Sequence, residues 1–184
     1  MNATPGQKAD GIFPTCSAVH RTVLVGGMSK PQLLIELRRS GVELNDAARL
    51  LFAHDGFTTL PTGVNFTTIE LSVGNLGCTR GATIARVHAR AKELGLSLCP
   101  LELAPHLRLQ FLEQPEGHLG HPPSSHRAPP GSLTVASQQL TDDDETPKGF
   151  YLRRVAGTRW LRGYRSGAEH RWNPEDRLVF CHGQ

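Results

Sequence analysis

The stretch GFYLRRVAGTRWLRGYR (residues 149–165) alternates apolar with aromatic or basic side chains on both sides of Ala156-Gly157, and it predicts a β-hairpin. A two-residue turn at Ala156-Gly157 pairs Arg153 with Trp160, because side chains alternate between the two faces along each strand. One face then carries Tyr151, Arg153, Trp160, Arg162 and Tyr164. The other face carries Phe150, Leu152 and Leu161, and we expect it to lie against the core.

The face with the aromatic and arginine side chains has two interpretations. An arginine over an aromatic ring contributes about 0.5–2 kcal/mol when the pair is partly desolvated, and such cross-strand pairs stabilise an exposed sheet face. The same residue types stack on bases and pair with phosphates. The face is therefore either a set of stabilising pairs or a binding surface for a protein or nucleic-acid partner. His170 and Arg171, beside Trp172, either extend that surface or form an exposed turn.

Composition limits what the chain can be. Its 184 residues are 38% apolar, which allows a modest core, and its net charge of +3 is too small for a general argument for nucleic-acid binding. The charge is uneven, because residues 149–184 hold seven arginines. The acidic run at residues 142–145 directly precedes them, and it either offsets this positive potential or is a solvated loop.

Targeting and cofactor signals are absent from the sequence. No run of about 18 apolar residues could span a membrane, and the N-terminus has no signal-peptide pattern, so we expect a cytoplasmic protein. Cys16, Cys78, Cys99 and Cys181 are too scattered for a zinc ribbon or a disulfide scaffold and are expected to be free thiols. The histidines at 118, 121 and 126 lie in a Pro-rich stretch without rigid backbone, and we expect neither a metal nor a cofactor.

Capping signals predict helices in the N-terminal half. Ser29 and Gln32 form a capping box for a helix that ends at Gly41, and Asn45 is the N-cap of a second helix that closes near Gly56. Residues 1–28 have only one short β-like run, at 21–25, and we expect them to be a poorly ordered extension.

The next segment has the outline of a helix-turn-helix motif. A second capping box predicts a short helix at residues 67–76, with a strand as the alternative because of its β-branched content. A glycine turn and an amphipathic helix over residues 84–94 follow. This order of elements is compatible with DNA binding, although such helix pairs are common in other proteins.

The C-terminal half predicts strands. Pro100 and Pro105 argue against one long helix and favour strands at residues 96–98 and 107–112, with more strands at 132–137 and 178–181. The expected fold is a single α+β domain over 29–184. In it, N-terminal helices (29–94) pack on a small, mostly antiparallel C-terminal sheet (95–184), and a Pro-rich loop over 115–131 projects from that sheet.

One small group of residues carries the enzyme alternative. His106 stands near Glu102 and Arg108, and a cleft holding the three could support acid–base chemistry. No nucleophile pattern or phosphate-binding loop accompanies them. We therefore expect a non-catalytic binding or regulatory protein that uses the hairpin face, with an enzyme of unknown reaction near His106 as the alternative.

Three motifs resemble segments shared by a set of uncharacterised bacterial proteins: LCPxE…HLRLQ, GFYLRR…WLRGY and WNPEDRxVF. The resemblance covers about residues 29–181. It implies a stable α+β fold in a bacterial cytoplasmic protein, and it implies no activity, cofactor or site residue.

Overall fold

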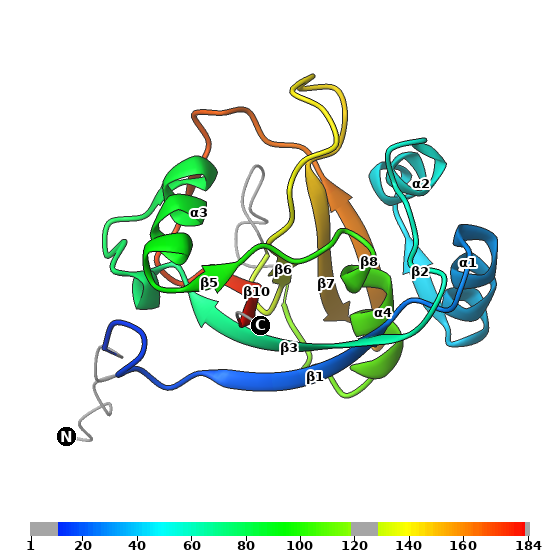
Figure 1. Cartoon of the computed structure of the whole chain (residues 1–184), viewed down its shortest axis with the longest axis horizontal. Helices are drawn as coiled ribbons and strands as arrows, with labels where there is room; N and C mark the ends of the chain where they lie inside the picture. Colours follow the sequence, from blue (N-terminus) through cyan, green and yellow to red (C-terminus); the bar gives the residue numbers. More distant parts are fainter. Residues whose placement is uncertain (1–10, 119–128, 183–184) are drawn as a thin grey trace.

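A computed structural model describes residues 11–118 and 129–182, and within them one large mixed sheet organises the chain (Figure 1). Its strand order is β1-β3-β10-β6-β7-β8-β2, and β5 pairs with β10 beyond the end of β6. The β10–β6 and β8–β2 pairs are parallel and the others are antiparallel. The strands are β1 (Val19–Val25), β2 (Val42–Leu44), β3 (Val64–Ser72), β5 (Leu96–Ser97), β6 (Leu133–Val135), β7 (Gly149–Val155), β8 (Thr158–Tyr164) and β10 (Arg177–His182).

Four α-helices and a short second sheet complete the described residues. The helices are α1 (Lys30–Arg39), α2 (Asp46–Ala53), α3 (Ile84–Glu93) and α4 (Leu103–Gln110), with a 3-10 turn, η1 (Gly74–Leu76). The second sheet pairs β4 (Ala82–Thr83) with β9 (Arg171–Trp172). The large sheet is curled, with β1 and β3 along one side and the hairpin of β7 and β8 rising steeply from it (Figure 1).

Each face of the curled sheet has its own apolar core. One face packs against α1, α2 and α4 through residues such as Leu37, Leu107 and Leu152. The other packs against α3 in a second buried cluster, which includes Val87 and Phe180. Burial of a side chain of this size contributes about 1.5–3 kcal/mol, so both cores are needed to order a sheet this wide. In Figure 1, α3 stands on one side of the sheet and the other three helices stand on the opposite side.

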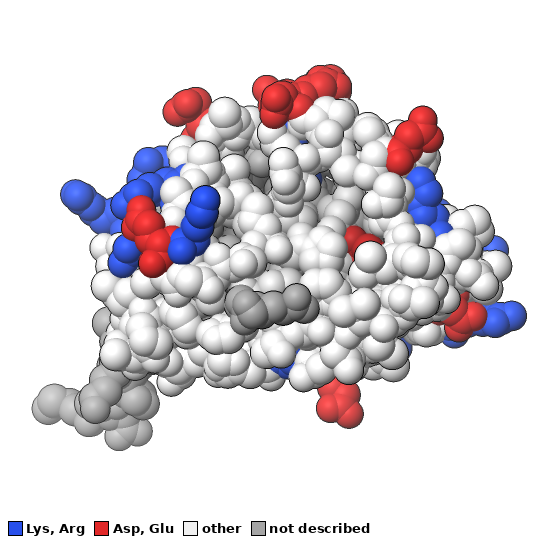
Figure 2. All heavy atoms as spheres, in the orientation of Figure 1, with Lys and Arg blue, Asp and Glu red and all other residues white. Residues whose placement is uncertain are grey.

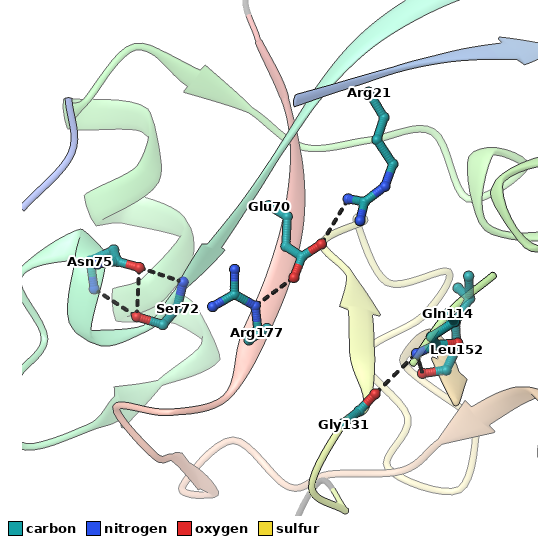
Figure 3. A network of polar contacts seen from close by, with 8 residues as sticks. All are labelled: Arg21, Glu70, Ser72, Asn75, Gln114, Gly131, Leu152 and Arg177. Atoms are coloured by element: carbon teal, nitrogen blue, oxygen red, sulfur yellow. Dashed lines mark hydrogen bonds and ion pairs between the residues drawn. The ribbon is translucent and has the colours of Figure 1, made fainter. Parts of the chain in front are cut away.

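The three strands at the β1 edge are also joined by charge. Glu70 of β3 accepts hydrogen bonds from Arg21 of β1 (2.7 Å) and from Arg177 of β10 (2.5 Å) (Figure 3). Its carboxylate thus bridges both neighbours of its own strand. Such charge-assisted bonds are stronger than neutral ones and hold the strands in register.

The hairpin at residues 149–165 has the predicted register. Arg153 lies opposite Trp160 and Tyr151 opposite Arg162. Ala156 and Gly157 have φ values of 49° and 75°, and positive φ at both central residues is what a type I′ turn requires.

The predicted arrangement of helices on a small C-terminal sheet is wrong. The structure contains helices and strands, but the N-terminal half contributes β1, β2 and β3 to the large sheet, and the helices are dispersed along the chain. The expected disorder of residues 1–28 is likewise wrong for β1, which pairs with β3 along its full length, whereas residues 1–10 lie outside the described residues.

Two elements have the opposite secondary structure to that expected. The segment 67–76 is mainly the strand β3, held between β1 and β10, so the first helix of the suggested helix-turn-helix does not exist. Residues 107–110, expected as a strand, belong to α4. Pro105 is the third residue of that helix, where the backbone N–H has no intrahelical partner, so the proline is tolerated.

The capping signals at Ser29 and Asn45 are confirmed, whereas the one at residues 67–70 is not. The helices predicted after Ser29 and Asn45 are α1 and α2, and both elements of the Ser29–Gln32 capping box are formed. The predicted helix at 84–94 is α3. None of the helices among residues 11–118 and 129–182 is both long and apolar enough to cross a bilayer.

Candidate functional site

The hairpin face carries its five predicted residues together on one side of β7 and β8. Phe150, Leu152 and Leu161 point to the opposite face, into the core that α2 and α4 share. On the predicted face Arg153 is buried, at 6% exposure. The other four members are partly buried: Tyr151, Trp160, Arg162 and Tyr164.

Two arginines of this face have buried nitrogen atoms without a hydrogen-bond partner among the described residues. The Arg162 guanidinium lies over the Trp160 ring, 5.1 Å from its centroid. The Nε and Nη2 atoms of Arg153 and the Nε of Arg162 are buried without a hydrogen-bond partner in the described part of the chain. A buried guanidinium without a counter-charge is costly, which favours binding of an anion here.

Two arginines on the opposite face of the hairpin lie close to oxygen atoms. Arg154 Nε lies 3.2 Å from a carboxylate oxygen of Glu116 without forming a hydrogen bond, and Arg159 Nε donates to the Leu112 carbonyl at 3.1 Å. Buried arginine nitrogens without a described hydrogen-bond partner therefore occur on both faces, and Arg153 and Arg162 differ from Arg154 in having no carboxylate partner among the described residues.

A cavity of about 330 Å³, here called the aromatic pocket, adjoins this face. Tyr151 and Tyr164 of the hairpin line it together with residues from other elements: Pro129, Thr134, Asp144, Arg165, Ser166, Gly167, His170 and Trp172. The Trp172 ring meets the edges of Tyr164 and His170, with centroids 5.6 and 5.8 Å away. His170 thus lies in the pocket wall against Trp172, whereas Arg171 is exposed and donates to the Gly81 carbonyl at 2.8 Å.

Trp172 is fixed in the pocket wall by its backbone. It pairs with Ala82, and Gly81 approaches so closely that a Cβ there would lie 2.3 Å from the Trp172 carbonyl oxygen. The indole is only 4% exposed, yet Nε1 has no hydrogen-bond acceptor among the described residues. A buried N–H donor without an acceptor is unusual in a folded protein.

A second cavity of about 600 Å³ lies beside the aromatic pocket and shares Asp144, Tyr164, Ser166 and Gly167 with it. Three more buried polar atoms without described partners come from residues in its walls: His88 Nε2, Ser137 Oγ and Thr141 Oγ1. Burial lowers the pKa of His88 to about 4 and raises the pKa of Tyr164, so both side chains are neutral at pH 7. The two cavities therefore share part of their walls, and His88 and Tyr164 contribute neutral hydrogen-bonding groups to the combined lining.

The acidic run stands above this region. Its four side chains, at residues 142–145, are exposed in the loop that Figure 2 shows at the top of the molecule. Lys148 Nζ donates to the Asp143 carbonyl at 2.8 Å and lies 3.7 Å from Asp144, while Arg165 Nε donates to the Glu145 carbonyl at 2.7 Å. The run is thus anchored by Lys148 and Arg165 and forms no described ion pair with Arg153 or Arg162.

The three residues of the enzyme hypothesis are all buried, and only two of them meet. His106 Nε2 lies 3.3 Å from Glu102 Oε1 and accepts a hydrogen bond from the Gly26 N–H at 3.1 Å. The other Glu102 oxygen accepts from the Leu60 N–H at 2.8 Å. Burial lowers the pKa of His106, and Glu102 partly opposes that shift. The pair links α4 to the end of β1 and to the loop before β3.

Arg108 points away from that pair. It donates to Gln114 Oε1 at 2.6 Å and to the Phe111 carbonyl. Burial lowers the pKa of Arg108 to about 10, with smaller contributions from Arg159 and Arg154, so the guanidinium keeps its charge at neutral pH. Gln114 in turn donates to the Gly131 and Leu152 carbonyls (Figure 3), which ties Arg108 into the hairpin's core side.

Sequence reasoning missed several walls of the two cavities. Thr134 reaches the aromatic pocket because β6 pairs with β7, opposite Tyr151, and Asp144 reaches it from the acidic loop. Ser137, Thr141 and His88 carry no motif, and only the fold brings them together. Within residues 11–118 and 129–182 no three His, Cys, Asp or Glu residues gather to hold a metal; His121 and His126 lie outside those ranges.

Comparison of the chain with protein-family models, with curated proteins and with solved structures finds no match.

Proposed function

We propose that this protein is a non-catalytic binding protein for short single-stranded nucleic acid, which it holds at the aromatic pocket and at Arg153 and Arg162. The observation that carries the proposal is the buried guanidinium of Arg153 and the partly buried one of Arg162, which have buried nitrogen atoms without described hydrogen-bond partners and adjoin a pocket walled by aromatic rings. An aromatic ring and an arginine side by side match a base and its phosphate.

The register sets the spacing of these groups. Tyr151 lies opposite Arg162 and two residues before Arg153 on the same strand. Side chains two residues apart on a strand are about 6.6 Å apart, and directly opposite ones are about 5 Å apart at Cβ. A ring that enters the pocket beside Tyr151 therefore has both guanidinium groups within reach of the anion attached to it.

The pocket also argues against two other kinds of partner. An acidic peptide would satisfy the arginines, but its carboxylates offer nothing to a cavity lined by Tyr151, Tyr164 and Trp172. A duplex keeps its bases stacked inside, and its phosphates would meet the exposed acidic run. A flexible single strand can place one base in the pocket and keep its backbone away from Asp144. Stacking of a base on an aromatic side chain contributes about 1–3 kcal/mol.

Fluorescence anisotropy with labelled single-stranded oligonucleotides of about ten nucleotides tests this, because such lengths match the sites of small single-strand binding domains. The titration is done at low salt, where phosphate contacts are strongest. We expect binding that Arg162→Gln weakens about tenfold, the loss of roughly one charged contact. Quenching of Trp172 fluorescence should follow the same curve.

Arg39→Gln is the matched control, since it removes the same charge from an exposed position on α1. It should leave affinity within about twofold. Absence of binding at low salt, equal weakening by both substitutions, or preferential binding of a glutamate-rich peptide would each contradict the proposal.

A further inference from the structure

Two of the four cysteines lie against each other, far from the hairpin face. Cys181 is in β10 opposite Ser97 of β5, and Cys99 follows two residues after Ser97. Their Sγ atoms are 3.4 Å apart, although the residues are 82 positions apart in sequence. A disulfide needs about 2 Å between the sulfurs, so the two atoms must approach by little more than about 1 Å to bond.

The two thiols differ in access. Cys99 is 3% exposed and its Sγ lies 3.5 Å from the Val179 carbonyl, to which it donates. Cys181 is 7% exposed and lines a cavity of about 320 Å³ together with Thr67, Ser97 and His182. A molecule of the size of hydrogen peroxide can therefore meet the Cys181 sulfur, while Cys99 lies behind it.

The acidities of the two thiols also favour Cys181 as the group that reacts first. The hydrogen bond between the two thiols lowers the pKa of Cys181, although burial opposes this, whereas burial raises the pKa of Cys99. Because the thiolate is the reactive form, Cys181 is the better nucleophile of the two. Cys99 remains a protonated thiol until Cys181 has been oxidised.

We propose that Cys99 and Cys181 are a redox-active dithiol, which a hydroperoxide converts to a reversible disulfide through Cys181.

The Cys181 thiolate attacks one peroxide oxygen and the O–O bond breaks. The second oxygen leaves with its electron pair and takes up a proton, and Cys181 becomes a sulfenic acid. The Cys99 sulfur then attacks the Cys181 sulfur. The S–O bond breaks, the S–S bond forms, and hydroxide leaves with the Cys99 proton as water. The two thiols lose two electrons and the peroxide gains them.

The disulfide would join β10 to the segment after β5. Cys99 also forms an isolated parallel bridge with Ser137, whose side chain lines the second cavity beside the hairpin. The proposal does not depend on the proposed nucleic-acid binding.

Peptide mapping of the folded full-length protein tests the proposal. The reduced protein is treated with hydrogen peroxide, free thiols are alkylated, and the peptides are analysed by mass spectrometry without reduction. We expect a cross-linked Cys99–Cys181 peptide pair that has lost two hydrogen atoms, with Cys16 and Cys78 alkylated. Treatment with dithiothreitol should remove the cross-link.

Substitutions separate the two roles. Cys99→Ser should leave Cys181 as a sulfenic acid that dimedone traps, and Cys78→Ser should leave the cross-link unchanged. Free alkylation of Cys181 after peroxide treatment, cross-links to another cysteine, or oxidation of wild-type Cys181 only to sulfinic acid would overturn the proposal. Because the wild-type map decides by itself, a variant that does not fold leaves the test intact.

Discussion

Asn45 and Gly163 are joined by two hydrogen bonds that attach the start of α2 to β8. Asn45 Nδ2 donates to the Gly163 carbonyl at 3.0 Å, and the Gly163 N–H donates to Asn45 Oδ1 at 2.8 Å. The same Oδ1 accepts from the Ala48 N–H at 3.0 Å and so also caps the helix. One amide side chain thus extends the ladder of a strand and begins a helix.

Asn45→Ala should lower the free energy of unfolding by about 1–3 kcal/mol, because it removes the cap and leaves the Gly163 groups without their partner. Urea unfolding followed by circular dichroism measures the loss. Asn45→Ser keeps an oxygen that can cap the helix, and it should lose less than Asn45→Ala. Equal losses would mean that the helix cap contributes nothing and that the whole loss comes from the bonds to Gly163.

Gly163→Ala should destabilise the same junction by steric overlap. A Cβ at Gly163 would lie 2.5 Å from the carbonyl carbon of Ala47 and 2.6 Å from the Ala48 nitrogen, and backbone atoms cannot move aside as a side chain can. Overpacking of this kind costs about 1–3 kcal/mol. Gly167→Ala is the control, since no atom lies within 4 Å of its added Cβ, and its thermal midpoint should be close to that of the wild type.

Glu70→Gln should weaken the edge where β1, β3 and β10 meet (Figure 3). The neutral amide oxygen is a weaker acceptor, and its NH2 group would face one of the two arginines. We expect a loss of about 1–3 kcal/mol in the free energy of unfolding, typical of a hydrogen bond to a charged group. Glu36→Gln removes the same charge from an exposed pair with Arg39 and should change stability by less than about 0.5 kcal/mol. Similar losses in the two variants would contradict a special role for Glu70.

Ala156→Asn should stabilise the protein, because Ala156 adopts φ 49° at a position where Asn-Gly is the preferred pair. A left-handed conformation costs a non-glycine residue about 1–2 kcal/mol, and asparagine recovers part of this. The expected gain is about 0.5–1 kcal/mol in urea unfolding. Ala156→Val should lower stability instead, since a β-branched residue tolerates positive φ poorly. A decrease with asparagine would indicate that the turn is held by contacts of the alanine methyl group.

Signals within a few residues of sequence predicted much of the secondary structure. The capping box at Ser29, the N-cap at Asn45 and the alternation around Ala156-Gly157 each depend on neighbours in the chain, and α1, α2 and the hairpin formed as expected. The strand β3 could not be recognised in the same way. Its β-branched content indicated a strand only as the alternative to a helix, because pairing with partners that begin at Val19 and Arg177 decides its conformation.

The candidate site was predictable only where one element carries it. The period of two along the hairpin placed Tyr151, Arg153 and Arg162 on one face. The rest of the aromatic pocket comes from β6, β9 and the acidic loop, which meet the hairpin through sheet pairing and loop packing. The sequence therefore indicated the face but not the cavity beside it.

His88 should make stability depend on pH in mildly acidic solution. In the folded protein burial lowers its pKa from 6.5 to about 4, so an unfolded chain binds a proton there at a higher pH than the folded one does. Stability is unaffected by this group above about pH 6.5 and falls as the pH decreases from 6.5 towards 4, because protons then favour the unfolded state. Asp142, Asp144 and Lys148 line the same cavity and are unchanged between wild type and variant. The comparison with His88→Asn therefore isolates the imidazole.

The free energy of unfolding should decline less steeply between pH 6.5 and 4 in His88→Asn, and NMR of the wild type should show a His88 midpoint near 4. Parallel stability curves together with a midpoint near the usual 6.5 would show that the imidazole is solvated rather than buried beside Ser137.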